Sequence, residues 1–192
     1  GAMGGNWTTA AAVKNVAIGN YALDGVMTAG ADYNVAVGYN AGTAITAGEG
    51  NVTIGKDAGE ALTEADSNIL IGVDAGDTLT TSGANVLIGR SAGQAISAGQ
   101  TTTDGTVGIG HAALYSLTNT VGNTAIGWQA AQLIATGTYN TVLGYGALDA
   151  AADDESWNVA IGANAMGACD QGSHGSADMD ANVAIGYQAL LG

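Results

Sequence analysis

Ten copies of a five-residue phrase, based on Asn-Val-Ala-Ile-Gly, set the pattern of hydrophobic and polar positions along this chain. By subtraction, the spacing between copies is 17 residues in most cases and at most 24. A unit this short cannot bury an apolar face alone, so we expect the repeats to stack on one another in a solenoid or fibre. The phrases end at Gly19, Gly38, Gly55, Gly72, Gly89, Gly110, Gly127, Gly144, Gly162 and Gly186.

Within each phrase we call the Asn position zero and the Gly position four. Positions one and three are almost always Val or Ile, as in Val16 and Ile18, and β-branched residues two apart predict a strand with one apolar face. We expect position three to form a continuous core row. Position two is small or aliphatic and uncharged, so both faces of the strand are predicted to be covered, as is typical of parallel sheets. The glycine is expected to be the corner at which the chain leaves the strand.

After the glycine the spacing of apolar residues changes. An alanine follows three residues on, and in most repeats a larger aliphatic residue follows seven on, as at Ala58 and Leu62. This spacing predicts a short helix of about two turns. The predicted fold class is therefore a mainly β repeat protein, a parallel β-solenoid or β-helix-like stack with one short helical turn per repeat of about 17 residues.

Strands in a sheet lie about 4.8 Å apart, whereas packed helices need roughly 8 to 10 Å. A stack with one helical turn per strand must then fan out into a horseshoe or interleave strands from several chains. We expect the second arrangement, in a homotrimeric fibre. Residues 15–192 are predicted to be a single ten-repeat array, residues 5–14 a lead-in, and residues 1–4 the scar of a cleaved tag.

Position zero is Asn in nine repeats and Thr106 in the other. An Asn at the same corner of every coil can hydrogen-bond the backbone or the Asn of the next coil, so we predict a structural ladder. A row of amides that binds a ligand is the alternative.

Composition and charge narrow the classes of function. The formal net charge of −14 repels a phosphate backbone, so nucleic acid is not expected as a partner. No apolar run is long enough to span a bilayer, and we expect no membrane insertion. The single Cys169 cannot form a disulfide within the chain, and stability must come from stacking or oligomerisation.

The repeats resemble the N-x-A-I-G repeats of phage tail-fibre and receptor-binding proteins, and are similar to the S-V-A-I-G repeats of trimeric autotransporter adhesin heads. The resemblance is carried by residues 15–19, by Asn-Thr-Ala-Ile-Gly-Trp-Gln-Ala at 123–130 and by Asn-Val-Ala-Ile-Gly-Tyr-Gln-Ala-Leu at 182–190. It implies a homotrimeric, extracellular fibre segment, of a virion tail fibre or a bacterial cell surface, that mediates attachment to a host or surface receptor. The repeats are longer than those of the adhesin heads.

The residue directly after each strand glycine is expected to lie in one surface column. Aromatic rings in such a column could stack on the apolar faces of sugars, and the alternative is that they cover a seam between coils or chains. The candidate ligand-binding residues are Tyr39, His111, Trp128, Tyr145 and Tyr187. A second column, directly before the Asn, contains Tyr33, Tyr139 and Trp157.

A metal site and a catalytic site have less support in the sequence than a binding surface. The loop at 170–180 carries three Asp and His174, a set that could hold a divalent cation but matches no ligand spacing, and we predict no metal and no cofactor. The sequence contains no nucleophile motif, paired catalytic acids or phosphate loop, so the chain is not expected to be an enzyme. Two alternatives stay open: a monomeric solenoid that binds glycans and a fibre domain that degrades polysaccharide.

Overall fold

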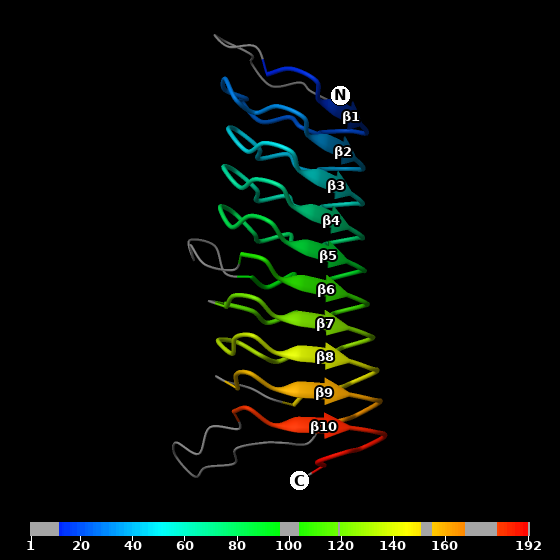
Figure 1. Cartoon of the computed structure of the whole chain (residues 1–192). Helices are drawn as coiled ribbons and strands as arrows, with labels where there is room; N and C mark the ends of the chain where they lie inside the picture. Colours follow the sequence, from blue (N-terminus) through cyan, green and yellow to red (C-terminus); the bar gives the residue numbers. More distant parts are fainter. Residues whose placement is uncertain (1–11, 97–103, 119, 151–154, 168–179, 192) are drawn as a thin grey trace.

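The computed structural model describes residues 12–96, 104–118, 120–150, 155–167 and 180–191, and these form a single stack of coils (Figure 1). Each coil contributes one strand of three residues to one ten-stranded sheet. The strands are β1 (Val16–Ile18), β2 (Val35–Val37), β3 (Val52–Ile54), β4 (Ile69–Ile71), β5 (Val86–Ile88), β6 (Val107–Ile109), β7 (Thr124–Ile126), β8 (Thr141–Leu143), β9 (Val159–Ile161) and β10 (Val183–Ile185).

All neighbouring strands are parallel and pair in chain order with equal repeat positions opposite each other, for example Val86 with Val107 and Ile88 with Ile109. The predicted parallel β-solenoid is therefore confirmed. Consecutive strands of one chain fill the sheet, so strands of other chains are not interleaved between them. The expectation of interleaving is wrong because it depended on a helix in every coil.

The strand glycines make the corner that the sequence predicts. Gly110 has a φ of 139°, and a Cβ atom built on it would lie 2.1 Å from the carbonyl oxygen of Gly127 in the next coil. At the other corners up to Gly162, an added Cβ would lie 2.4 Å or less from the carbonyl oxygen of the next corner glycine. Only glycine allows the backbones of successive coils to approach this closely.

The buried side of the strands differs from the prediction. Position two faces the interior: Leu70 and Leu87 have no exposed surface, whereas Ile18 is 60% exposed and Ile88 is half-buried. The predicted core row at position three is wrong, because positions one and three point away from the interior of the solenoid. Alternation identifies two faces of a strand but does not say which is inside when both are apolar.

The segment after the glycine is a stacked turn, so the predicted helical turn is also wrong. The glycine and the second and fourth residues after it have positive φ in every coil, as at Gly55, Asp57 (56°) and Gly59 (58°). Left-handed residues at alternate positions prevent a right-handed helix. The turns instead bond to neighbouring coils: Asp57 N–H donates to Tyr39 O (2.9 Å) and Gly59 N–H to Ala75 O (3.0 Å). The described residues contain no helix, and so none that could cross a membrane.

The core is filled by compensation between strand position two and the fourth residue after the glycine. In the coil of β5, Leu87 is large and is matched by Gly93, where an added Cβ would lie 2.6 Å from Leu87 Cδ1. In the coil of β6 the sizes are reversed, since Gly108 is matched by the fully buried Leu114. In these two neighbouring coils a large side chain at one position is thus matched by a glycine at the other, which keeps the interior closely packed.

Candidate functional site

The asparagines at position zero form a buried ladder. Asn51 Oδ1 accepts hydrogen bonds from Asn68 N–H (3.0 Å) and Asn68 Nδ2 (3.1 Å), and Asn51 Nδ2 donates to Ala65 O (2.7 Å). Similar bonds connect Asn123 to Asn140 and Asn158 to Asn182. The side chains are used in satisfying the backbone of the corner, which confirms the predicted ladder and leaves no row of free amides for a ligand.

The residue directly before each Asn has a left-handed backbone in all ten coils, a feature that sequence reasoning missed. We call these residues the leading column. Their φ angles lie between 57° and 69°. Gly50, Gly105 and Gly122 are the signal that could have revealed it, because glycine adopts this conformation readily. The leading column consists of Lys14, Tyr33, Gly50, Ser67, Ala84, Gly105, Gly122, Tyr139, Trp157 and Ala181.

Two bulky aromatic residues of the leading column lie together on the surface. The rings of Tyr139 and Trp157 are nearly parallel, with an interplanar angle of 16° and centroids 6.5 Å apart, and these residues are 54% and 58% exposed. A Cβ on Gly122 would lie 2.8 Å from the Tyr139 ring, so the absent side chain makes room for it. The left-handed backbone is common to all ten coils, so the large exposed rings, and not the backbone, distinguish Tyr139 and Trp157 from the Gly, Ser and Ala of other coils.

The residues directly after the strand glycines form the trailing column, which contains all five candidate ligand-binding residues. Tyr39, Trp128, Tyr145 and Tyr187 are exposed, by 48%, 48%, 58% and 73%. His111 is half-buried and stacks on Trp128, with ring centroids 4.1 Å apart and an interplanar angle of 12°. Three candidates, His111, Trp128 and Tyr145, follow the adjacent strands β6, β7 and β8, whereas Tyr39 and Tyr187 lie near the two ends of the stack (Figure 1). Their role in binding a ligand stays a prediction. The full column is Asn20, Tyr39, Lys56, Val73, Arg90, His111, Trp128, Tyr145, Ala163 and Tyr187.

Between the two columns lies the outward side of the sheet, formed by strand positions one and three, which we call the strand face. Its side chains are Val, Ile, Leu and Thr. Most of those in β2 to β9 are half-buried, and the exposed ones include Val16 (46%), Leu143 (47%) and Ile185 (67%). The three Lys and Arg residues of the chain, Lys14, Lys56 and Arg90, all lie in the two bordering columns. None of the 17 acidic residues occupies the strand face or either column. This surface therefore differs sharply from the rest of a strongly acidic chain.

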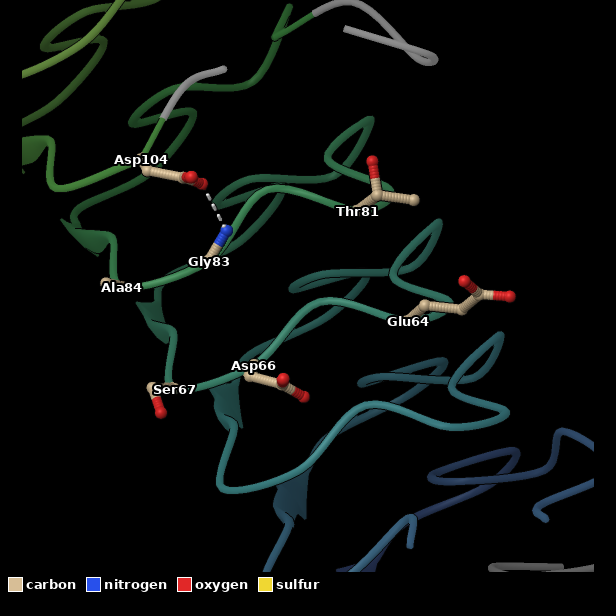
Figure 2. A pocket seen from close by; sticks show the side chains of 7 residues that line it. All are labelled: Glu64, Asp66, Ser67, Thr81, Gly83, Ala84 and Asp104. Carbon is tan, nitrogen blue, oxygen red and sulfur yellow. Dashed lines mark hydrogen bonds between the residues drawn. The ribbon is translucent and has the colours of Figure 1, made fainter. Parts of the chain in front are cut away.

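Acidic residues gather elsewhere, around a shallow pocket beside the coils of β4 to β6 (Figure 2). Glu64, Asp66 and Asp104 line it. Asp104 Oδ1 accepts a hydrogen bond from Gly83 N–H (2.7 Å), and Asp66 Oδ1 accepts one from Glu49 N–H (2.7 Å). Two of the three carboxylates thus bind the backbone of the preceding coil. Within the described ranges, no three His, Cys, Asp or Glu residues are placed to hold a metal ion.

A second acidic group lies in the turns after β3 and β4. Burial raises the pKa of Glu60, and the charges of Asp57 and Asp77 raise it further. Burial also raises the pKa of Asp77, against the hydrogen bond from Gln94, and the charge of Asp74 adds to the increase. Lys56 forms an ion pair with Asp57. These carboxylates repel one another, so they cost stability when ionised.

The candidate cation loop at 170–180 lies outside the described residues except for Asp180, and so does Cys169. Asp180 Oδ1 accepts a hydrogen bond from Ser156 N–H (2.7 Å), the same capping role as that of Asp104. No family model, curated protein or solved structure matches this chain.

Proposed function

We propose that this chain is a segment of a homotrimeric attachment fibre, extracellular and carried on a phage tail fibre or a bacterial cell surface. The observation that carries the proposal is the strand face: a flat apolar surface, without acidic residues, along the whole length of a chain with a net charge of −14. Monomeric proteins rarely leave so large an apolar surface in water, and one that runs along an entire molecule favours an interface.

The dimensions of this surface fit a stable interface. Nine steps between ten strands, at about 4.8 Å each, give a length of about 43 Å, and the distance from leading to trailing column is about 20 Å. The product, about 860 Å², is the area that one chain offers to its two neighbours in a trimer, and it is of the same order as the roughly 800 Å² that each partner buries in a standard interface.

Charge favours further copies of this chain as the partner. Acidic side chains that faced each other across an interface between identical chains would repel, and none of the 17 acidic residues occupies a position of the strand face or of either column. Apolar side chains that repeat at every coil also match a second array with the same spacing. Three copies are proposed because the repeats resemble those of trimeric fibres.

Attachment is assigned to the exposed aromatic residues of the two columns, which could stack on a cell-surface glycan or receptor. We infer a binding role without catalysis. Hydrolysis of a glycosidic bond ordinarily needs two carboxyl groups, about 5 to 9.5 Å apart, on either side of the bond, and neither column carries one. The exposure of Trp128 and Tyr145 in a single chain also favours a second candidate, a monomeric solenoid that binds glycans.

Sedimentation of the wild-type protein at micromolar concentration separates the two candidates. The proposal predicts three times the chain mass of 18.7 kDa, whereas the monomeric module would sediment at 18.7 kDa. Incubation with bacterial capsular polysaccharides, followed by a reducing-sugar assay, tests the absence of catalysis. Release of new reducing ends would instead indicate a polysaccharide-degrading fibre domain.

A further inference from the structure

Four aromatic residues of the two columns lie at the coils of β7 to β9, whereas Tyr33 and Tyr39 flank β2 and Tyr187 follows β10. Trp128 follows β7, Tyr139 and Tyr145 lie on either side of β8, and Trp157 precedes β9. All four are about half exposed, from 48% to 58%. Within one chain, however, they form two separate columns on opposite borders of the strand face, about 20 Å apart across an extended strand. A ligand that runs along the stack therefore meets only one pair.

Three-fold symmetry changes this arrangement. A contact around a three-fold axis is heterologous, so one border of each chain meets the opposite border of its neighbour. If the axis runs along the stack, equal coils lie at equal heights. The trailing column of one chain then faces the leading column of the next chain at the coils of β7 to β9.

We propose that Trp128 and Tyr145 of one chain, together with Tyr139 and Trp157 of the next, form a composite aromatic groove at each seam of the trimer that binds a neutral glycan. The inference rests on the homotrimer proposed above. It adds a site that is incomplete in any single chain and that repeats three times around the fibre.

The local structure supports a binding role for the leading half of this groove. Tyr139 and Trp157 keep a left-handed backbone, with φ of 58° at both, in a column where Gly, Ser or Ala stands in six of the other coils. Main-chain bonds hold them: Tyr139 N–H donates to Val121 O (3.1 Å) and Trp157 N–H to Thr138 O (2.9 Å). The left-handed backbone recurs in every coil, so the exposed rings are the feature that distinguishes these two positions.

The chemistry favours uncharged sugars. Flat aromatic rings pack against the apolar faces of sugar rings, and the coil spacing of about 4.8 Å is comparable with the length of one sugar unit. The border columns hold no carboxylate, and their Lys and Arg residues precede or follow β1, β3 and β5, away from the groove. The net charge of −14 disfavours an anionic polysaccharide.

Cysteine cross-linking tests the seam. In a Cys169→Ser background, Tyr139→Cys and Tyr145→Cys are combined in one chain and oxidised, or treated with a short bismaleimide. A disulfide needs Cα atoms within about 7 Å, and the two sites of one chain lie at opposite ends of β8, so linkage within a chain is not expected. The proposal predicts a covalent trimer from the double variant and no covalent trimer from either single variant.

Other outcomes contradict the proposal in distinguishable ways. Covalent dimers from a single-cysteine variant would indicate a two-fold contact in which like columns meet. Failure of both reagents on a protein whose mass by light scattering is that of a trimer would overturn the seam and leave the fibre intact. Failure on a protein with the mass of one chain would overturn the homotrimer itself.

Tryptophan fluorescence tests the ligand. In a Trp7→Phe background the remaining tryptophans are Trp128 and Trp157. Hexamers of glucose, mannose and N-acetylglucosamine serve as neutral probes, and polygalacturonate serves as the anionic probe. At least one neutral hexamer is expected to change the fluorescence saturably, and polygalacturonate is not. A response to no neutral probe, or an equal response to the anionic one, would overturn the assignment of ligand class.

Two variants show whether both chains contribute to one site. Trp128→Ala and Trp157→Ala should each weaken binding of the responding hexamer by about tenfold or more, as loss of a central aromatic contact does. Leu133→Ala, which removes a 45% exposed apolar side chain outside both columns, is the control and should bind normally. Co-refolding the two tryptophan variants should restore complete seams in about a quarter of positions by random assembly around the ring. No recovery on mixing would contradict a composite groove.

Discussion

Thr106 interrupts the asparagine ladder directly above Asn85. Its backbone N–H donates to Asn85 Oδ1 at 3.1 Å, as an asparagine would, but its own Oγ1 is buried and has no hydrogen-bond partner among the described residues. Asn85 Oδ1 therefore accepts only a backbone hydrogen bond from Thr106. Asn68 Oδ1, in contrast, accepts bonds from both the backbone N–H and the side-chain amide of Asn85. An unpaired buried hydroxyl costs free energy, so the ladder has a weak point at the coil of β6.

Thr106→Asn should repair this point. The new amide is expected to donate to Asn85 Oδ1 and to the carbonyl of Thr120, the position equivalent to Ala65 beside Asn51. We predict a free energy of unfolding about 1 kcal/mol higher than that of the wild type. Urea unfolding followed by circular dichroism measures it. Asn123→Thr, which would create a second gap, is the matched control and should lower stability by about 1 to 3 kcal/mol. A destabilised Thr106→Asn would show that the rung tolerates only the smaller side chain.

The size compensation between Leu87 and Gly93 predicts a coupled pair. Gly93→Ala should destabilise the fold by about 1 to 3 kcal/mol, because its Cβ would overlap Leu87 Cδ1. In the Leu87→Ala background the overlap with Leu87 is gone and the 3.0 Å approach to Ile96 Cδ1 is left, so the same change should cost less. Gly105→Ala separates the effect of backbone strain, since Gly105 has a φ of 69° and nothing within 4 Å of an added Cβ. Equal costs of Gly93→Ala with and without Leu87 would contradict the packing described here.

The raised pKa values of Glu60 and Asp77 predict a pH dependence of stability. A carboxyl group whose pKa is higher in the folded state contributes stability that is present at acid pH and is lost as the pH rises through the folded pKa. Asp77→Asn and Glu60→Gln should therefore raise the melting temperature at neutral pH, and the amide oxygen introduced by Asp77→Asn could still accept the bond from Gln94. The gain should disappear at acid pH, below the unfolded pKa of a carboxyl group, where the wild-type groups are protonated in both the folded and the unfolded state. A gain that did not change between the two pH values would show that charge is not its cause.

Much of the fold can be predicted from sequence because the repeat is regular. The ten strands, the corner glycines and the asparagine ladder all follow from residues at fixed positions, and the structure contains each of them. The side of the strand that faces inward could not be predicted. Val and Ile at positions one and three are as apolar as the Leu residues at position two, so hydrophobicity gave no criterion for choosing between the faces.

The predicted helix fails for a similar reason. Alanine three residues and an aliphatic residue seven residues after the glycine do face the core, as Ala58 and Leu62 show, but a turn with alternating left-handed residues creates the same spacing. The contrary signal was present in residue types. Asn, Asp and Gly recur two and four residues after the corner, as at Asp57 and Gly59, and these types tolerate a positive φ best.

The sequence predicts the two columns of the candidate site, but it does not predict that the strand face between them is exposed. Trp128 and Tyr145 are exposed on adjacent coils, as column stacking requires. Their relation to Tyr139 and Trp157 depends on which face of the sheet is outside, and this was the feature that alternation left open. Once the strand face is known to point outward, the absence of acidic residues from it becomes visible in the sequence as well.

The strand face is the surface that we propose joins copies of this chain. Light scattering on Ile88→Asp measures whether it does, with Ala47→Asp, an added charge at an exposed site off the strand face, as the control. We predict three times 18.7 kDa for the wild type and for Ala47→Asp, and 18.7 kDa for Ile88→Asp with an unchanged circular dichroism spectrum, because Ile88 lies outside the solenoid core. A wild-type mass of 18.7 kDa, or a folded Ile88→Asp that keeps the trimer mass, would contradict the account.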